Sequence, residues 1–557
     1  MLSYRKLAMR VLGRPLHTGG GIDSPRPASQ RAAAFILTAA MLTTFTAPAF
    51  AKTWYIENGD ITISAGKTEG TNKVSQGSTT DEEDTDTVIT NNNRDTASSH
   101  TVTIDAGNDK VEVTLKDVNI KADSGSALTS NGDVTLTLKG ENHLTGGNGD
   151  IYGGDGITSS GSLTISGGTV TATGGNNTGS DGSGGSGIYS VSGSVTISGG
   201  TVNATGGEGS KNNSTSGGSG IYSDSGDVTI SGGTVNANGG NGGTISGGDG
   251  ICSSGGVTIS SGSTVTANGG SGEDGSGGRG ITSNGGVTVS GGTVNAKGGS
   301  GKNGNGGDGI LSFNPVAISG GTVKSNGGSG TISGGDGIRS LDHVAISGGT
   351  VKSNGGSGNL SGGNGIISYD IDLSGSLELT AKAGSPSGKA LSRAGKELDL
   401  NTIKDKLGPG AKVTVTDANG KVNQVSIPRP VEPEEPVIPE ESSSSSDGGS
   451  ATSSAPASPL PGLTVTDKDG QRISYTSTQS GNTLTVCVGR FTASFRISLA
   501  ALRQLRAEGI EAITFQTILC STTLSVDELL TMGGEDAEIV LTHHIRSSTL
   551  TVGGKAV

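Results

Sequence analysis

The sequence has few of the residues that stabilise most globular domains. Aromatic residues make up only 3% of the chain, and three cysteines are spread over 557 residues. An odd number of cysteines allows at most one disulfide within the chain, so disulfides cannot be the main support of the fold. Residues 153–367 also lack the 3.6-residue apolar period of helices. These absences argue against a helical bundle and against a disulfide-stabilised fold.

Positive charge and long apolar runs are scarce as well. The chain has 38 Lys and Arg against 51 Asp and Glu, which gives a formal net charge of −13. A nucleic-acid surface needs an excess of basic residues, so nucleic acid is not expected as a partner. Beyond the N-terminal region no segment approaches the roughly 18 apolar residues that span a bilayer. We therefore expect no membrane span.

An export signal is indicated near the N-terminus. Arg31 precedes an apolar run over residues 32–42, and the segment Ala-Phe-Ala at 49–51 matches a small-x-small cleavage site. We expect residues 1–51 to be a signal peptide and the mature protein to begin near Lys52, secreted or attached to the cell surface. The stretch before Arg31 is long for a signal peptide, so a later translation start and an extended signal both fit.

Glycine is abundant, with 102 residues, and much of it belongs to a repeat. From residue 153 to residue 367 a unit of about 30 residues recurs, reading G-I-x-S-x-G-x-V-T-I-S-G-G-T-V-x-A-x-G-G, followed by a variable Gly/Ser/Asn loop. Its first isoleucine returns at spacings of 28 to 33 residues, at Ile157, Ile188, Ile221, Ile251, Ile281, Ile310, Ile338 and Ile366. A period of this length is typical of solenoids, with insertions confined to one face.

Within each unit apolar and polar residues alternate, as in Val195-Thr196-Ile197, which is the period of a β-strand. Each unit supplies three short strands whose Ile, Val and Ala side chains point to one side, and stacked coils would join them into one apolar column. Propeller blades need four strands, and leucine-rich repeats need a Leu/Asn frame. We therefore predict an all-β fold, a right-handed parallel β-helix over residues 52–428, with less regular coils at both ends.

The last part of the chain is predicted to be a separate domain. Residues 429–461 are rich in Pro, Glu and Ser, the composition of an extended linker. Residues 462–557 then form a small α+β domain of unknown role. Its predicted strands are 463–466, 483–488, 491–497, 510–516 and 538–542, and its predicted helices are 499–508 and 526–532. Cys487 and Cys520 both lie here, and either a disulfide between them or two free thiols fit the sequence.

Three N-terminal blocks carry a resemblance to a known family. They read TWYIENGDITI at residues 53–63, VTLKDVNI at 113–120 and LTLKGENHLTGG at 136–147. The chain from 52 to 367 resembles secreted bacterial β-helix proteins that are described as carbohydrate-binding and are related in fold to pectate lyases. The resemblance implies polysaccharide binding, of acidic plant polymers with calcium involved, and no established lyase chemistry.

An acidic run is the candidate calcium site. Five carboxylates fall within six residues, and they are Asp81, Glu82, Glu83, Asp84 and Asp86. A hard cation bound between them would relieve their mutual repulsion. The alternative is an acidic, solvent-exposed loop. The predicted fold requires no cofactor, and calcium is the candidate ion. The aspartates of the G-G-x-G-I turns, Asp155, Asp249, Asp308 and Asp336, are expected to stabilise turns instead.

Two outward-facing columns are candidate ligand sites. Tyr189 and Tyr222 occupy the same position in successive units, where exposed rings could contact a sugar, although ordinary stacking between coils explains them as well. Lys324 and Lys352 share another column and should lie in adjacent coils. An anionic ligand would offset their repulsion, and solvent screening is the alternative. The distal half is locally positive, with Lys297 and Arg339 expected to assist the pair.

No catalytic residues are expected. A polysaccharide lyase would need carboxylates that hold calcium beside a proton-abstracting base, and the nearest approximation, Arg279 near Asp274, is more simply a solvated loop charge. We expect a monomeric extracellular protein that binds a polysaccharide of the polygalacturonate type without catalysis. The alternative is a structural or adhesive cell-surface rod that binds a protein or the cell wall, and a degenerate lyase is the third candidate.

Overall fold

A computed structural model describes residues 52–211, 213–428 and much of 462–556. In the last range it does not describe 468–470, 474, 481, 489–491, 518–520, 532–536, 544–547 and 553–554. The predicted signal peptide and the predicted linker lie outside the described residues, so both stay predictions. The chain divides into two compact units, residues 1–433 and 434–557, and each is described by itself.

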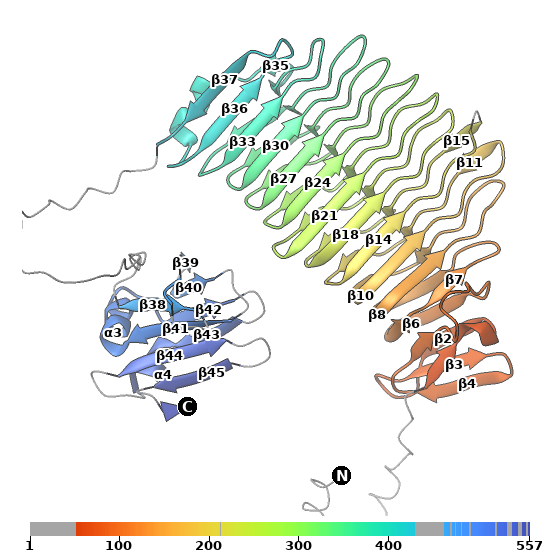
Figure 1. Cartoon of the computed structure of the whole chain (residues 1–557), viewed down its shortest axis with the longest axis horizontal. Helices are drawn as coiled ribbons and strands as arrows, with labels where there is room; N and C mark the ends of the chain where they lie inside the picture. Colours follow the sequence, from red (N-terminus) through yellow and green to blue (C-terminus); the bar gives the residue numbers. More distant parts are fainter. Residues whose placement is uncertain are drawn as a thin grey trace, which may run out of the picture. The chain divides into compact units, whose positions relative to one another are not determined.

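The first unit is a parallel β-solenoid of about 13 turns, as predicted (Figure 1). Each regular coil contributes three short strands, and each strand pairs in parallel with its equivalents in the coils before and after it. Ile188 lies opposite Ile221, which lies opposite Ile251. The sequence repeat therefore becomes columns of like residues along the solenoid axis.

Three rows of strands run along the solenoid. Row 1 holds β9 (Ile157–Ser159), β12 (Ile188–Ser190), β16 (Ile221–Ser223), β19 (Ile251–Ser253), β22 (Ile281–Ser283), β25 (Ile310–Ser312), β28 (Ile338–Ser340), β31 (Ile366–Ser368) and β34 (Leu391–Arg393). Row 2 holds β13 (Val195–Ile197), β17 (Val228–Ile230), β20 (Val257–Ile259), β23 (Val287–Val289), β26 (Val316–Ile318), β29 (His343–Ile346) and β32 (Asp370–Leu373). Row 3 holds β7 (Asn119–Lys121), β14 (Thr201–Thr205), β18 (Gly233–Asn238), β21 (Ser263–Asn268), β24 (Thr293–Lys297), β27 (Thr322–Asn326), β30 (Thr350–Asn354), β33 (Glu378–Lys382) and β36 (Lys412–Thr416).

The first coils are built from longer strands and the ends from antiparallel ones. β6 (Val102–Lys116), β8 (Leu128–Thr145) and β10 (Leu163–Thr173) each pass through more than one row. The N-terminal end holds β1 (Thr53–Tyr55), η1 (Ile56–Asn58), β2 (Ile61–Ala65), β3 (Asn72–Gln76), β4 (Thr79–Asp84) and β5 (Val88–Thr90). The other end holds β35 (Lys396–Glu397), η2 (Leu400–Lys406) and β37 (Val422–Ser426). Antiparallel pairing of β3 and β37 with their neighbours interrupts the parallel stacking at both ends.

The inward Ile, Val and Ala side chains of all three rows form one continuous buried cluster. These side chains are small, so the cluster gains its burial from stacking coil on coil and not from the packing of large rings. In two distal coils the inward alanine of row 3 is replaced by Ser325 and Ser353. Both hydroxyls are buried, and each donates to a backbone carbonyl at 2.6 Å, that of Gly337 or Gly365.

The glycine pairs that flank each loop form a second ordered feature. Their backbones are hydrogen-bonded in a zigzag along the solenoid: Gly240 N–H donates to Gly218 O, and Gly248 N–H donates to Gly240 O, both at 2.8 Å. A Cβ on Gly240 would stand 1.9 Å from Gly207 O. We name these residues the glycine spine: Gly147, Gly154, Gly175, Gly185, Gly207, Gly218, Gly240, Gly248, Gly270, Gly278, Gly299, Gly307, Gly328, Gly335, Gly356, Gly363 and Gly384.

Because the spine draws the two ends of each loop together, the loops form a separate series alongside the strand rows (Figure 1). Two loops pair through β11 (Asp181–Ser183) and β15 (Ser214–Ser216). The glycine content that would suggest low complexity is thus required by close backbone contact.

The second unit is a small α+β domain, as predicted. One sheet has the order β38-β41-β44-β45-β46 and the other β39-β40-β42-β43. The elements are β38 (Leu463–Thr466), β39 (Thr476–Ser480), β40 (Thr483–Cys487), β41 (Ala493–Ser498), α3 (Leu499–Ala507), β42 (Ala512–Gln516), β43 (Ser521–Ser525), α4 (Val526–Thr531), β44 (Glu538–His543), β45 (Ser548–Val552) and β46 (Lys555–Ala556). All five predicted strands and both helices are present, whereas β39, β43, β45 and β46 were not predicted.

A serine caps the start of each helix. Ser498 Oγ accepts the N–H of Ala501 at 3.2 Å, and Ser525 Oγ accepts that of Glu528 at 3.4 Å. Cys487 ends β40, and its thiol donates to Gln516 Oε1 at 3.5 Å. Cys520 lies outside the described residues, so its pairing with Cys487 stays a prediction. In the part of the chain that the structure describes, no helix is long and apolar enough to cross a membrane.

Candidate functional site

Row 3 presents a polar face on which the predicted lysine pair lies. Lys324 in β27 and Lys352 in β30 are register partners in adjacent coils, as predicted, and both are exposed. Neither forms an ion pair with any residue that the structure describes. Parallel strands lie about 4.8 Å apart, so the two ammonium groups start from neighbouring positions and repel each other.

Two further lysines flank this pair. Lys297 lies in the neighbouring column, one coil before Lys324, and Lys382 lies in that same column, one coil after Lys352. We call Lys297, Lys324, Lys352 and Lys382 the lysine strip. Lys382 was not predicted, because it falls beyond the last regular repeat, although alignment of β33 with β30 would have revealed it. Glu378 lies on the same face, diagonal to Lys352 and opposite Lys412, so the strip ends in a region of mixed charge.

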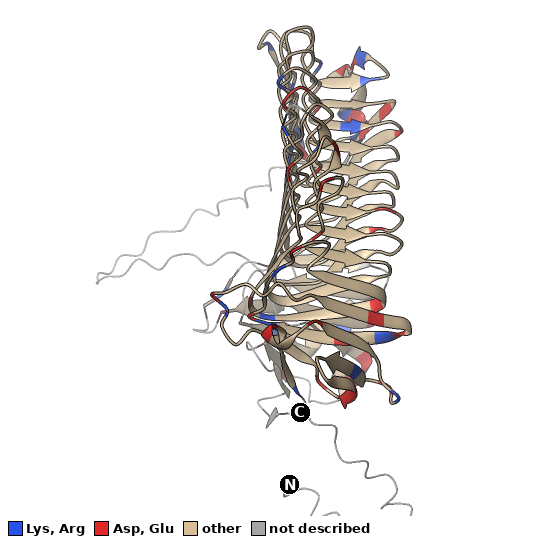
Figure 2. Cartoon of the chain, turned by 90° about the vertical axis from the view of Figure 1, so that its right-hand side faces the viewer, with Lys and Arg blue, Asp and Glu red and all other residues tan. Residues whose placement is uncertain are grey.

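From β14 to β24 the outward side chains of row 3 are uncharged apart from Lys297, and asparagines of this face are hydrogen-bonded between coils. Asn236 Nδ2 donates to Asn203 Oδ1, and Asn354 Nδ2 donates to Asn326 Oδ1, both at 2.8 Å between coils. Figure 2 shows the charged residues concentrated in the coils near both ends of the solenoid, with few on the strands between them. The lysine strip therefore stands against a background of fixed Thr and Asn side chains.

Arg339 does not lie on this strip, contrary to the prediction that it assists Lys324 and Lys352. It belongs to β28 in row 1, between Leu311 and Ile367 of the neighbouring coils. Its Nη1 is 3.7 Å from Asp336 Oδ2. The reason is its place in the repeat: the residue after the marker isoleucine faces outward from row 1, whereas the lysines face outward from row 3.

Tyr189 and Tyr222 lie one coil apart, as predicted, but are half-buried and stacked on each other. Their ring centroids are 5.2 Å apart with an interplanar angle of 14°, and the Tyr222 hydroxyl donates to Asp224 at 2.7 Å. Burial, and then the hydrogen bond to Asp224, raise the pKa of Tyr222. One face of each ring is covered by the other, so a sugar would meet a smaller aromatic surface than two free rings offer. Sugar contact at this pair stays a prediction.

The aspartates of the G-G-x-G-I turns bind backbone between coils. Oδ1 of Asp308 accepts the N–H of Asp336 at 2.7 Å, and Oδ1 of Asp336 accepts that of Asn364 at 2.6 Å. Asp155 and Asp249 make the same bond to Ser186 and Arg279. These aspartates were expected to stabilise turns. They do so by joining successive coils, because each carboxylate oxygen accepts a backbone N–H from the equivalent turn of the next coil.

The carboxyl groups of Asp308 and Asp336 lie one coil apart, and both residues are buried. Burial, and then the charge of Asp336, raise the pKa of Asp308 to about 6. Arg279 Nε lies 4.0 Å from Asp308 Oδ2, so this arginine neighbours a carboxylate of the turn column.

The structure does not bring the predicted calcium ligands together. Glu82 pairs with Lys52 at 2.6 Å, whereas buried Asp84 accepts the indole N–H of Trp54 at 2.8 Å. Glu83 accepts the Thr71 hydroxyl at 3.1 Å, and Asp81 forms hydrogen bonds with Ser75. These four carboxylates therefore have separate partners, and within β4 only Asp84 is buried. No cluster of three or more potential metal ligands is found in the described residues. Calcium binding at Asp81 to Asp86 stays a prediction from sequence.

Comparison with protein-family models, curated proteins and solved structures finds no match to this chain.

Proposed function

We propose that this protein binds an anionic polysaccharide outside the cell and does not act on it chemically. The observation that supports this most is the register of Lys324 and Lys352, two exposed ammonium groups in adjacent coils without ion-pair partners in the described residues. Lysines placed opposite each other on a sheet cost stability, by a few tenths of a kcal/mol to about 1 kcal/mol. A polyanion that lies along the axis would offset that cost.

The geometry of the strip favours a polymer over a small ion. From Lys297 to Lys382 the strip crosses three coil steps, or roughly 14 Å at about 4.8 Å a step. A polyuronate carries a carboxylate on every sugar, so it can contact several lysines at once and present hydroxyls to the Thr and Asn columns. The flat strand face needs no deep pocket, which suits a ligand that extends in one direction.

Two sequence features complete the proposal. The signal-peptide pattern over residues 1–51 supports export, and the blocks at 53–63, 113–120 and 136–147 resemble carbohydrate-binding β-helix proteins. Calcium enters the proposal only as a bridge between carboxylates, and its contribution is measured with a chelator.

An adhesive rod is the second candidate, and one observation favours it. Phe313, Leu341 and Tyr369 each follow a strand of row 1 in three successive coils and are exposed by 48%, 51% and 77%. An apolar column of this kind suits contact with a protein.

Binding of the purified full-length chain to a glycan array separates the two candidates. We expect retention on polygalacturonate and other polyuronates and none on neutral glucans, with retention falling as salt rises. Indifference to chelator would remove calcium from the proposal. Absence of binding to every anionic glycan would contradict polysaccharide binding and leave the adhesive rod.

A further inference from the structure

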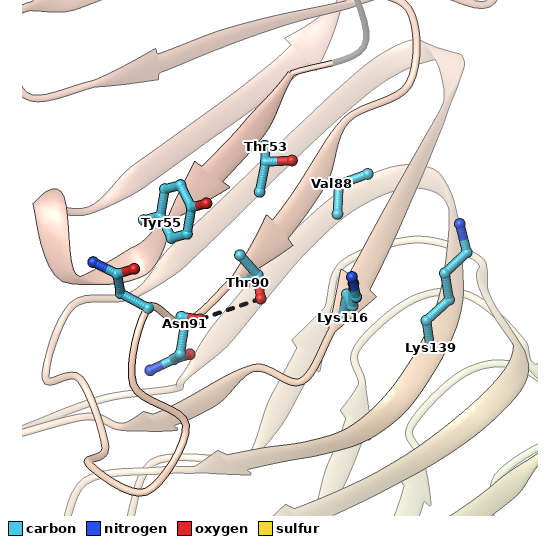
Figure 3. A pocket seen from close by; sticks show the side chains of 8 residues that line it. Thr53, Tyr55, Val88, Thr90, Asn91, Lys116 and Lys139 are labelled. Atoms are coloured by element: carbon cyan, nitrogen blue, oxygen red, sulfur yellow. Dashed lines mark hydrogen bonds between the residues drawn. The ribbon is translucent and has the colours of Figure 1, made fainter.

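A groove in the first coils of the solenoid lies apart from the lysine strip (Figure 3). Its volume is about 520 Å³, and its lining includes Thr53, Tyr55, Val88, Asn92, Lys116 and Lys139. Figure 3 shows Tyr55 on one side of the groove and the two lysines on the other, with Val88 and Thr90 between them. The groove is large enough for a small organic ligand, since ligand pockets begin at roughly 300 Å³.

Strand register explains how these side chains come together. Tyr55 in β1 lies opposite Thr90 in β5, Thr90 lies opposite Lys116 in β6, and Lys116 lies opposite Lys139 in β8. Both lysines are exposed, and Tyr55 is exposed by 38%. The column thus places an accessible aromatic ring about two coil steps, roughly 10 Å, from the first of two neighbouring ammonium groups.

Carboxylates around the groove are bound to other groups. Glu57 Oε1 accepts the backbone N–H groups of Asn92 at 2.7 Å and Asn93 at 3.1 Å. Asp117 Oδ1 lies 3.8 Å from Arg94 Nη1 and accepts the N–H of Glu141 at 3.2 Å. In the described part of the chain Lys116 and Lys139 form no ion pair. Their side of the groove therefore presents two exposed ammonium groups without an ion-pair partner in the described residues.

We propose that this groove binds a small sugar acid, with its carboxylate between Lys116 and Lys139. The Tyr55 ring contacts the apolar face of the sugar, because aromatic surface is the usual partner of a sugar C–H face. The Thr53 hydroxyl and the Asn92 amide, both exposed, supply hydrogen bonds to the sugar hydroxyls. The two lysines in register favour an anionic ligand, and the Tyr55 ring favours a ligand larger than an inorganic ion.

The groove acts independently of the lysine strip. Five coil steps separate β8 from β24, where the strip begins at Lys297, or roughly 24 Å, which is about three times the Debye length of about 8 Å at physiological salt. The site therefore does not rest on the proposed polymer binding, and each can fail without the other.

The test is calorimetric titration of the full chain with a galacturonate dimer. We expect the double variant Lys116→Ala with Lys139→Ala to bind at least about tenfold more weakly, a loss of about 1.4 kcal/mol. Lys324→Ala with Lys352→Ala is the matched control and should bind the dimer as the parent chain does. Tyr55→Ala should weaken binding, whereas Tyr55→Phe should retain most of it.

Two other probes define the ligand class. A neutral glucose dimer should not bind, and inorganic phosphate should bind at least about tenfold more weakly than the galacturonate dimer. Dimer binding that ignores Lys116 and Lys139 would overturn the proposal, and so would phosphate that binds as tightly as the dimer. If the alanine variant melts earlier than the parent chain, Lys116→Gln with Lys139→Gln replaces it and must show the same loss.

Discussion

The apolar column and the glycine spine repeat with the same period, but different forces hold them. The column gains stability from burial of side chains, at roughly 25 cal/mol for each Å² of apolar surface. It therefore accepts related residues, such as Val289 where other coils have Ile, or the hydrogen-bonded Ser325 where they have Ala. The spine has no side chains to bury, and its backbone hydrogen bonds form only because nothing separates the two segments. In one coil, therefore, the apolar column tolerates a change of side chain, whereas the glycine spine does not tolerate an added side chain.

A charge in the apolar column should have the largest effect. Ile251 is fully buried, and Ile251→Asp would leave an unpaired carboxylate among Ile and Val side chains. We expect a loss of several kcal/mol in the free energy of unfolding. Thr258→Asp, on the outward side of the same coil, is the control and should cost about 0.5 kcal/mol or less. Thermal melting measures both, and an unchanged melting temperature for Ile251→Asp would contradict the stacking.

A single methyl group in the spine should come next. In Gly240→Ala the new Cβ meets the backbone oxygen of Gly207 at 1.9 Å, and a backbone atom cannot rotate away. We expect a loss of about 1–3 kcal/mol or more. Gly199 has open space around its Cβ position, so Gly199→Ala should be nearly neutral. Equal stability of the two variants in a urea titration would show that the spine is not close-packed.

The sequence allowed the apolar column to be predicted, but not the spine or the groove. Alternating apolar residues at a constant spacing determine which side chains stack, so the strand rows and the Lys324–Lys352 pair followed directly. Glycine has no side chain whose polarity could indicate burial, and a Gly/Ser/Asn loop has the composition of a flexible one.

Two other features depended on geometry that the repeat does not encode. Lys116 and Lys139 are only 23 positions apart, since 139 − 116 = 23, whereas the regular units span 28 to 33 residues. The pairing of Lys116 with Lys139 could therefore not be predicted from the spacing of the regular repeat. Arg339 is separated from the lysine strip because neighbouring strands of one coil face different directions, and a count of local charge cannot detect this.

A buried carboxyl group between spine and column should make stability depend on pH. Asp308 follows a spine glycine and precedes Ile310, and its pKa is raised to about 6 from an ordinary value of 3.8. Between these values the folded state binds more protons than the unfolded state, so the free energy of unfolding falls as pH rises from about 4 to about 6 and stays lower above.

Asp308→Asn removes this ionisation and keeps the acceptor, as Asn364 shows in its bond to Lys389 N–H at 3.0 Å. We expect the variant to exceed the parent chain in stability at pH 8 by on the order of 1 kcal/mol, and to match it near pH 4. A variant that is less stable at pH 8 would mean that attraction to Arg279 outweighs burial.

Removal of the lysine pair should have the smallest effect on stability. Lys324 and Lys352 lie on the outward side of the apolar column, so Lys324→Ala with Lys352→Ala leaves the column intact and removes a repulsion. We expect a gain of a few tenths of a kcal/mol, which disappears at high salt. Lys297→Ala, with an asparagine on each side in its own column, is the control and should change nothing measurable. A loss of stability in the double variant would indicate that the lysines make favourable contacts.

The most direct test of polysaccharide binding is the affinity for polygalacturonate of the parent chain and of Lys324→Ala with Lys352→Ala. Measurement at about 0.1 M and about 1 M salt compares Debye lengths of about 10 Å and about 3 Å. We predict that high salt weakens binding by the parent chain, and that the double variant binds weakly already at low salt. Affinity that is unaffected by salt, by chelator and by both lysines would contradict the proposed function.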